Sequence, residues 1–393
     1  MNRAEPLRSH LDQFQQRSLT VGVVSLALCG GGALLSPEQF FRSYLLAYLF
    51  WVGIALGCCA LAMLHSLTGG AWGAVIRRVL ESGMRTLPWM ALLFVPLLFG
   101  LRELYVWARP EEVANDALLQ QKAFYLNVPF FVLRTVGYFL VWLSIAYFLN
   151  KWSLEHDRTA EPSCLRRLET LSGPGLVLYG GTVTFASIDW VMSLEPHWYS
   201  TIYGLLFIVG YSLTTLAFAI VVTTLLANEK PLSEIVTAAH FHDLGNLLLA
   251  FVMLWAYVTF SQYLIIWSGN IAEEVPWYLH RGHGGWEWVG LSLIIFQFIL
   301  PFVLLLSRNT KRRAQILLRV AGAVLFMRLV DLFWLVAPSF PNSGLRIHWM
   351  DVMAPIGLGG IWLALFVRRL KGHSLLPLHD PSLEGVPGPL RGM

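Results

Sequence analysis

Ten apolar runs alternate with short polar segments along this chain, and each run is long enough to cross a membrane as a helix. A bilayer core of about 30 Å takes about 20 apolar residues of α-helix, and a helix satisfies its own backbone hydrogen bonds. The sequence therefore predicts an all-α polytopic membrane protein of about ten transmembrane helices. We expect the spans at residues 18–35, 40–65, 86–106, 127–149, 174–194, 201–227, 244–267, 286–306, 315–337 and 349–367.

The composition agrees with a membrane protein that has little room for a soluble domain. Of its 393 residues, 56% are hydrophobic and 13% are charged, whereas soluble domains carry roughly 25% charged residues. We expect a cytoplasmic N-terminal segment at 1–17, a transmembrane domain at 18–370 and a disordered cytoplasmic tail at 371–393. No basic tract is interleaved with aromatic residues, so no nucleic-acid partner is expected.

The basic residues predict the orientation of the chain in the membrane. Of the 28 Lys and Arg residues, 19 fall in the segments that share a side with the N-terminus, six fall on the other side and three lie within spans. Cytoplasmic segments of membrane proteins carry the excess of Lys and Arg. We therefore expect an even number of spans, with both termini in the cytoplasm.

Motifs that hold a cofactor or a metal are missing from the sequence. The four cysteines, Cys29, Cys58, Cys59 and Cys164, form neither Cys-x-x-Cys nor Cys-x-x-Cys-His. The histidines lie in loops, tails or helix ends, so no opposed pair is placed to ligate a haem b within the membrane. We expect this chain to bind no metal ion and no haem.

Residues 189–204, Asp-Trp-Val-Met-Ser-Leu-Glu-Pro-His-Trp-Tyr-Ser-Thr-Ile-Tyr-Gly, join two apolar runs and contain the most informative polar residues. Asp189 lies within the first run, where a carboxylate costs several kcal/mol unless it is paired, hydrated or protonated. Glu195, Pro196, His197 and Trp198 then predict a tight turn at the membrane interface, because proline fixes the bend and indole rings favour the headgroup level.

Charged residues within other spans fall at a depth similar to that of Asp189. Since polar groups in lipid face the bundle interior and pair, the five residues of this set can form one layer in the outer leaflet: Arg134, Asp189, Arg328, Asp331 and Asp351. An acid left over after pairing is a candidate for proton exchange. In the alternative interpretation, Arg328 and Asp331 are only a structural i,i+3 pair, and Asp351 only caps the last helix.

A second polar group lies on the cytoplasmic side, where His242 and Asp243 open the seventh run. These residues are either a capped helix start with solvated histidines or a point of proton uptake, because histidine titrates near neutrality. Three polar residues between the two groups predict either a file of water or helix–helix hydrogen bonds: Tyr257, Gln262 and Gln297.

Several separated motifs, in order along the chain, closely resemble a membrane subunit of bacterial alternative complex III, a quinol:cytochrome c (or other electron acceptor) oxidoreductase. The resemblance covers roughly residues 40–370, and the chain looks like the smaller of the two polysulfide-reductase-like (NrfD-like) membrane subunits of that complex. The motifs are residues 189–204, together with 41–51, 67–73, 125–131, 242–246, 254–270 and 331–336.

The resemblance implies two four-helix bundles flanked by extra helices, in a bacterial inner membrane next to the quinone pool. It implies no redox cofactor in this chain and leaves quinol binding open. The haem c and iron–sulfur clusters are expected in partner subunits: the larger NrfD-like subunit, an iron–sulfur subunit and multihaem cytochrome c subunits. The candidate proton path comprises Arg134, Asp189, His242, Asp243, Arg328 and Asp331. The candidate quinol or interface residues are Glu195, His197 and Trp198.

Two other functions use the same residues. A secondary transporter can use intramembrane carboxylates, but transporters often have helices broken at the midplane, and no span here is clearly interrupted there. The chain can also be an inert membrane anchor. The Asp189→Asn substitution distinguishes a scaffold from a proton relay, because a scaffold that still assembles should tolerate it.

Overall fold

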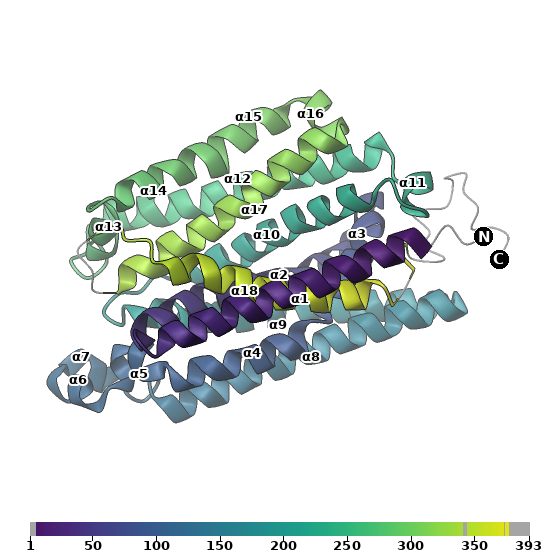
Figure 1. The fold of residues 1–393 in the computed structure, drawn as a ribbon. Helices are drawn as coiled ribbons and strands as arrows, with labels where there is room; N and C mark the ends of the chain where they lie inside the picture. The colour runs from purple at the N-terminus through teal and green to yellow at the C-terminus, as the bar shows by residue number, and fades with distance from the viewer. Residues whose placement is uncertain (1–4, 341–343, 373, 377–393) are drawn as a thin grey trace.

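The computed structural model describes residues 5–340, 344–372 and 374–376, and every regular element within these ranges is helical (Figure 1). Eight of these helices are long and apolar enough to cross a membrane, and a ninth span is formed if a bent helix pair counts as one. The prediction of an all-α polytopic membrane protein is confirmed. The eight are α2 (Pro37–Thr68), α8 (Val128–Thr159), α9 (Pro162–Trp190), α10 (Tyr203–Leu226), α12 (Ala238–Gly269), the continuous run α14–η3–α15 (Trp286–Leu306), α17 (Ala314–Val336) and α18 (Trp349–Leu370).

The bent pair consists of α3 (Ala71–Met84) and α4 (Leu87–Phe99), which meet at 41°. The predicted span 86–106 covers α4, the short helix α5 (Leu101–Leu104) and the start of the 3₁₀ helix Val106–Ala108, but no part of α3. The sequence pattern missed α3 because this helix carries several charges, and these pair with one another inside the protein rather than facing solvent.

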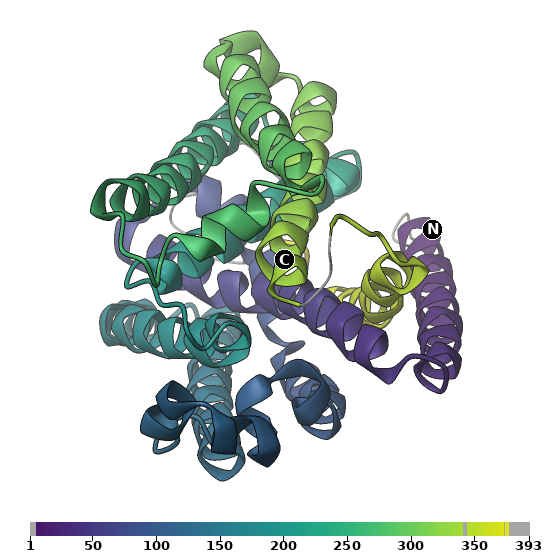
Figure 2. The same ribbon diagram turned by 90° about the vertical axis from the view of Figure 1, so that its left-hand side faces the viewer.

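The predicted first span, 18–35, does not pass the test of length and apolarity that the eight helices pass. Its residues form the second half of α1 (Glu5–Ala33), so helix continues through much of the predicted N-terminal segment 1–17. Leu, Gln and Arg favour helix in the first half, but the charged and polar residues of this half, together with four glycines in the second half, lower the apolarity of α1. In the described ranges the count is therefore nine spans at most, with α1 as an additional helix alongside α18 (Figure 2).

The spans form two four-helix bundles, as predicted. The first contains α2, the bent pair α3–α4, α8 and α9. The second contains α10, α12, the run α14–η3–α15 and α17. Helix α10 packs against α2 and α9 of the first bundle as well as against α12 and α17 of its own, while α1 and α18 flank α2 (Figure 2).

The two ends of the bundle differ in what they carry. At one end, here called the terminal end, α1 begins, α18 ends and the short helices α11 (Leu232–Ile235) and α16 (Arg308–Arg312) lie (Figure 1). The other end, here called the distal end, carries α5 (Leu101–Leu104), α6 (Pro110–Asn115), α7 (Ala117–Lys122) and α13 (Pro276–Arg281). In the predicted disordered tail, 371–393, residues 373 and 377–393 lie outside the described residues.

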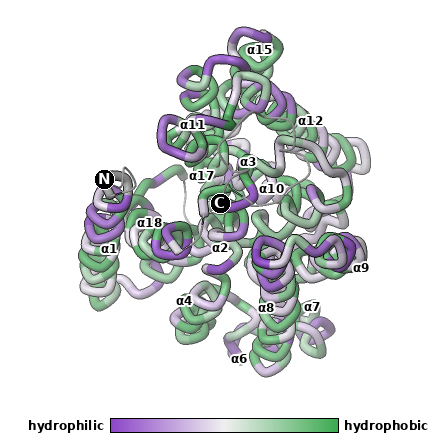
Figure 3. The backbone as a smooth tube through the Cα atoms, turned by 90° about the vertical axis from the view of Figure 1, so that its right-hand side faces the viewer, coloured by the Kyte–Doolittle hydropathy of each residue, from purple (hydrophilic) through white to green (hydrophobic). Residues whose placement is uncertain are grey.

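Hydrophobic residues occur along the outer helices as well as the central ones (Figure 3), and many large apolar side chains are exposed. Helices α2 and α10 are almost wholly buried at the centre, whereas α8, α9, α12 and α15 present large apolar side chains outward. Such exposed apolar faces are suited to contact with lipid chains.

Candidate functional site

A cavity of about 1190 Å³ opens at the distal end, between the turn that follows α9, helix α13 and the segment that follows α17. Glu195, His197 and Trp198, the three predicted quinol or interface residues, all line it. His280 and Trp277 of α13 form part of the facing wall. The structure therefore brings one predicted set of residues together in one place.

The turn after α9 enters the protein rather than lying flat at its surface. Helix α9 ends at Trp190, a single 3₁₀ turn follows at Met192–Leu194, and Pro196 then redirects the chain. Trp198 is buried and stacks on Trp277 of α13, with ring centroids 4.7 Å apart and an interplanar angle of 14°. The Trp198 ring therefore packs in the wall of the cavity.

Glu195 forms an ion pair with Arg281 of α13, a partner that the sequence pattern did not indicate. The Arg281 Nη2 lies 3.0 Å from Glu195 Oε1, to which Ser339 Oγ also donates at 2.7 Å. His280 Nδ1 lies 3.9 Å from the other carboxylate oxygen, Oε2. The spacing of Trp277 and Arg281 is the signal that was missed, since an i,i+4 pair on α13 puts the guanidinium 3.6 Å from the centre of the indole ring.

Arg281 also closes the end of α17. Its side chain is fully buried, and it donates to the carbonyl oxygens of Leu335 at 2.8 Å and Trp334 at 3.3 Å. The last carbonyls of a helix have no partner within the helix, and a cation there also complements the helix dipole. Burial lowers the pKa of the Arg281 guanidinium, while the carboxylate of Glu195 acts in the opposite direction.

The loop containing α6 and α7 covers the edge of this cavity. His197 Nε2 lies 2.7 Å from Asp116 Oδ2, and Lys122 Nζ donates to the carbonyl oxygen of Pro196 at 2.6 Å. Asp116 also caps α7, because its Oδ1 accepts from the backbone N–H groups of Leu118 and Leu119. These backbone donors, with His197 beside them, lower the pKa of Asp116.

Asp189 is paired in the first bundle, as predicted for a carboxylate at this depth. It is fully buried, and Arg134 of α8 binds it with two prongs, Nε to Oδ2 at 2.8 Å and Nη2 to Oδ1 at 3.0 Å. Tyr138 Oη donates to Oδ2 at 2.7 Å. In all three contacts an oxygen of Asp189 accepts the hydrogen bond, so none of them requires a proton on the carboxyl group.

Arg328 and Asp331 form a separate buried pair in the second bundle. They lie one turn apart on α17, and the guanidinium donates to Asp331 Oδ2. Trp255 Nε1 of α12 donates to the same oxygen at 3.3 Å, and Arg328 Nε donates to Thr214 of α10 at 3.2 Å. The pair therefore connects three helices of the second bundle.

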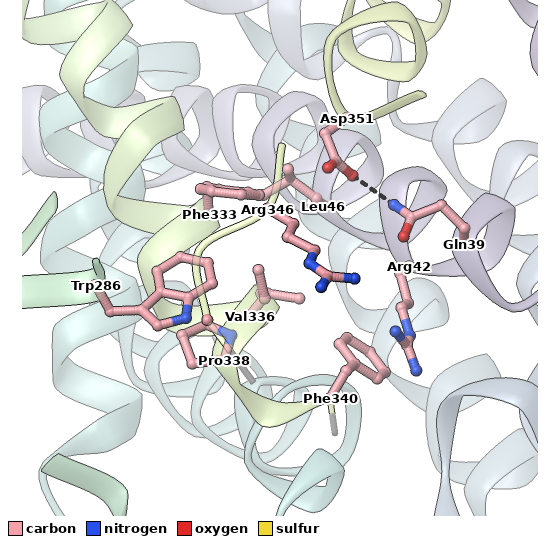
Figure 4. A pocket seen from close by; sticks show the side chains of 12 residues that line it. Gln39, Arg42, Leu46, Trp286, Phe333, Val336, Pro338, Phe340, Arg346 and Asp351 are labelled. Carbon is pink, nitrogen blue, oxygen red and sulfur yellow. Dashed lines mark hydrogen bonds between the residues drawn. The ribbon is translucent and has the colours of Figure 1, made fainter. Parts of the chain in front are cut away.

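The predicted single layer of five charges is thus divided into three separate contacts. Asp351 caps α18, since its Oδ2 accepts from the backbone N–H of His348 at 2.9 Å, which confirms the predicted cap. Its Oδ1 accepts from Gln39 at 2.9 Å beside a small pocket of about 40 Å³ (Figure 4). Arg42 and Arg346 line the same pocket, between the starts of α2 and α18.

His242 and Asp243 lie at the terminal end, on α12 of the second bundle, whereas Asp189 lies in the first bundle. His242 Nδ1 is 3.7 Å from Asp243 Oδ1, and both side chains are accessible. The helix start itself is capped by Thr237 with His240. A path from Asp243 towards Asp189 would have to leave one bundle and enter the other.

The three residues predicted to line a water file do not point the same way. Tyr257 is 67% exposed and faces outward, whereas Gln262 and Gln297 are buried in the second bundle. Gln297 lies in a π-helical segment, η3 (Leu293–Ile299). Within the described residues, Gln262 Oε1 and both amide atoms of Gln297 have no hydrogen-bond partner. Buried polar atoms of this kind require explanation, and ordered water is one.

A buried cluster at the terminal end of the first bundle was not predicted. Glu81 of α3 is 4% exposed and pairs with Arg77 Nε at 3.1 Å and Arg78 Nη1 at 2.5 Å. Arg78 also pairs with Asp157 of α8. The i,i+3 and i,i+4 spacing of these residues is the signal that would have indicated a charged but buried helix.

Comparison with known proteins gives no match, either among protein families or among curated proteins. Across the residues that the structure describes, no three His, Cys, Asp or Glu side chains gather closely enough to hold a metal ion.

Proposed function

We propose that this chain is an integral membrane subunit of a quinol-oxidising complex of the alternative complex III type, in a bacterial inner membrane. The proposal rests on the sequence resemblance and on one structural observation, the distal cavity. That cavity places the carboxylate of Glu195 and the imidazole of His280 on walls that also carry stacked indole rings.

The lining of the cavity is suited to a quinol headgroup. Oxidation of a quinol to a quinone releases two protons and two electrons, and the protons need acceptors within hydrogen-bond reach. Glu195 and His280 can accept them, while Leu194, Leu279 and the ring of Trp198 supply apolar contact for the headgroup and its tail. The electrons would pass to iron–sulfur and haem c centres in the partner subunits.

Proton movement across the membrane is the second role that we propose, and the second bundle has the better set of groups for it. His242 and Asp243 lie at its terminal end and Asp331 in its distal half, and Trp255 on the same helix as His242 contacts Asp331. The unpaired amide atoms of Gln262 and Gln297 in this bundle support water there. The Arg134–Asp189 pair then serves the stability of the first bundle.

The test is purification of the tagged chain from its native membranes, followed by haem analysis and assay of quinol-dependent acceptor reduction. Co-purification with iron–sulfur and multihaem cytochrome subunits, together with quinol oxidation, supports the proposal. A chain that emerges alone and without redox activity overturns it and makes transport the leading alternative.

The role of the cavity is tested in the same preparation with Glu195→Gln. We expect this variant to lose at least about a hundredfold in quinol oxidation. Because it also leaves Arg281 without its carboxylate, activity is compared at equal amounts of assembled complex. The matched control is Glu111→Gln, because Glu111 is an exposed distal carboxylate that does not line the cavity. Equal activity of both variants would assign quinol oxidation to another subunit.

A further inference from the structure

A second polar cavity, of about 190 Å³, lies between the start of α12 and the short helix α16. Both of these segments are at the terminal end (Figure 1). The lining of the cavity consists of Ala239, His242, Asp243, Arg308 and Arg312. The quinol-oxidising role proposed above makes no use of its two arginines. The volume exceeds that of several water molecules, each of which occupies about 30 Å³ in the liquid.

The charge around this cavity is predominantly positive. Arg308 and Arg312 are four residues apart and line it together, opposite the single carboxylate of Asp243. Asp243 lies 3.7 Å from His242. Within the described part of the chain, neither Arg308 nor Arg312 forms an ion pair. Two guanidinium groups are thus directed to one cavity without a protein carboxylate bound to either.

Lys311, between these arginines, is a buried cation that also lacks a carboxylate partner among the described residues. It is only 6% exposed, and its stem packs over Gly245 so closely that a Cβ there would lie 2.6 Å from Lys311 Cγ. Its ammonium group donates to Asn246 Oδ1 at 2.7 Å. Burying an ammonium group without a counter-ion is costly, so an anion near Lys311 would lower the free energy of the folded protein.

Asn246 and the start of α12 connect this buried charge to the cavity. The Asn246 amide nitrogen lies 3.3 Å from His242 Nδ1, and His242 forms part of the cavity wall. Ala239, also in the wall, is in the first turn of a 32-residue helix. Backbone N–H groups in a first turn have no acceptor within the helix and favour anions.

We propose that this cavity binds the phosphate group of an anionic phospholipid. Arginine pairs and helix N-termini bind phosphate by shape and charge. A lipid is favoured over free phosphate because the preceding helix, α15 (Leu300–Leu306), presents Val303 and Leu306 outward at 59% and 57% exposure. These side chains lie next to α16 along the chain and provide an apolar track for the acyl chains of the bound lipid.

The test uses the full chain, purified in detergent and stripped of lipid, with native mass spectrometry and thermal melting as readouts. Phosphatidylglycerol is compared with zwitterionic phosphatidylcholine and with inorganic phosphate. We expect added phosphatidylglycerol to bind, to stay bound in the mass spectrometer and to raise the melting temperature of the wild type. The double variant Arg308→Ala/Arg312→Ala should weaken this binding at least about tenfold. Arg313→Ala is the matched control, because Arg313 is an exposed neighbour that does not line the cavity.

Two results would overturn the lipid site. One is a double variant that retains phosphatidylglycerol as well as the wild type and Arg313→Ala do. The other is stabilisation of the wild type by inorganic phosphate alone, with no preference for phosphatidylglycerol over phosphatidylcholine, which would assign the cavity to free phosphate. The variant Arg308→Lys/Arg312→Lys keeps the charge without the planar fork. Partial binding by it, between wild type and the alanine variant, supports a guanidinium–phosphate contact independently of any folding defect in the alanine variant.

Discussion

Arg281 reaches Glu195 at 3.0 Å from α13, although 86 residues separate them in the chain. The same guanidinium lies over the Trp277 ring and donates to the carbonyl oxygens that end α17. One buried side chain therefore fixes the turn after α9, helix α13 and the end of α17 around the distal cavity.

We expect Arg281→Lys to destabilise the protein by about 3 kcal/mol. A lysine cannot reproduce the planar fork, and the buried carbonyls and Glu195 would lose donors. Denaturant or thermal unfolding of the purified protein measures the change. Arg346→Lys is the control, since Arg346 is an exposed arginine in the segment between α17 and α18. Equal stability of the two variants would contradict this role of Arg281.

Asp189→Asn should lower the stability of the first bundle by about 3 kcal/mol, because it leaves the charge of Arg134 buried without a partner. We expect the double variant Arg134→Met/Asp189→Asn to recover most of the loss, since it removes both charges. A double-mutant cycle in unfolding free energy measures the coupling. A double variant no more stable than Asp189→Asn alone would refute a mainly structural pair.

Asp331→Asn should abolish proton translocation in vesicles that contain the assembled complex, while quinol oxidation continues. By contrast, the double variant Arg134→Met/Asp189→Asn, which removes both buried charges of the first bundle, should still translocate protons. Proton release per quinol, followed with a pH dye, is the measurement. Unchanged proton release in Asp331→Asn would remove this residue from the path.

We expect the stability that Asp116 gives to the loop containing α6 and α7 to be lost in acid. Its pKa is lowered in the folded protein by the α7 backbone donors, so its contribution is present above the ordinary pKa of 3.8 and is lost as the pH falls through the folded value. Asp116→Ala should therefore lower the melting temperature at pH 6, and the difference from wild type should shrink at pH 3. Glu112→Ala, an exposed change on α6, should show no such pH dependence.

Gly360→Ala should separate α1 from α18. A Cβ on Gly360 would lie 2.6 Å from the Cα of Gly22 and 2.4 Å from the carbonyl oxygen of Ser18. Both obstacles are backbone atoms, so the helices must move apart, at a cost of about 1–3 kcal/mol. Gly322→Ala on α17, where nothing lies within 4 Å, is the control and should be neutral or slightly stabilising. Matching stabilities would refute the close helix contact.

The architecture could be predicted from the sequence because hydrophobic runs determine which segments enter lipid. Helix ends were less predictable, since polar residues do not stop a helix that projects beyond the membrane. Helix α8 runs to Thr159, ten residues past the predicted end of its span. In the same way, the charges of α3, such as Glu81, hide this helix from a hydropathy pattern although they pair inside the protein.

The residues of the candidate site could be predicted from the sequence more readily than the contacts that these residues make. The turn at Glu195 was identified because a proline and two charges interrupt apolar sequence, but its partner Arg281 is distant in the chain and depends on tertiary packing. The five charges predicted at one depth form separate contacts for a related reason. Equal depth says nothing about which bundle a helix joins, and Asp189 and Asp331 lie in different ones.

Helix α10 forms a wall of both bundles at once. A helix shared in this way cannot tilt for one bundle without repacking the other. The packing of the two bundles therefore depends on one helix, so a substitution that displaces α10 should disturb the buried ion pairs on both sides of it.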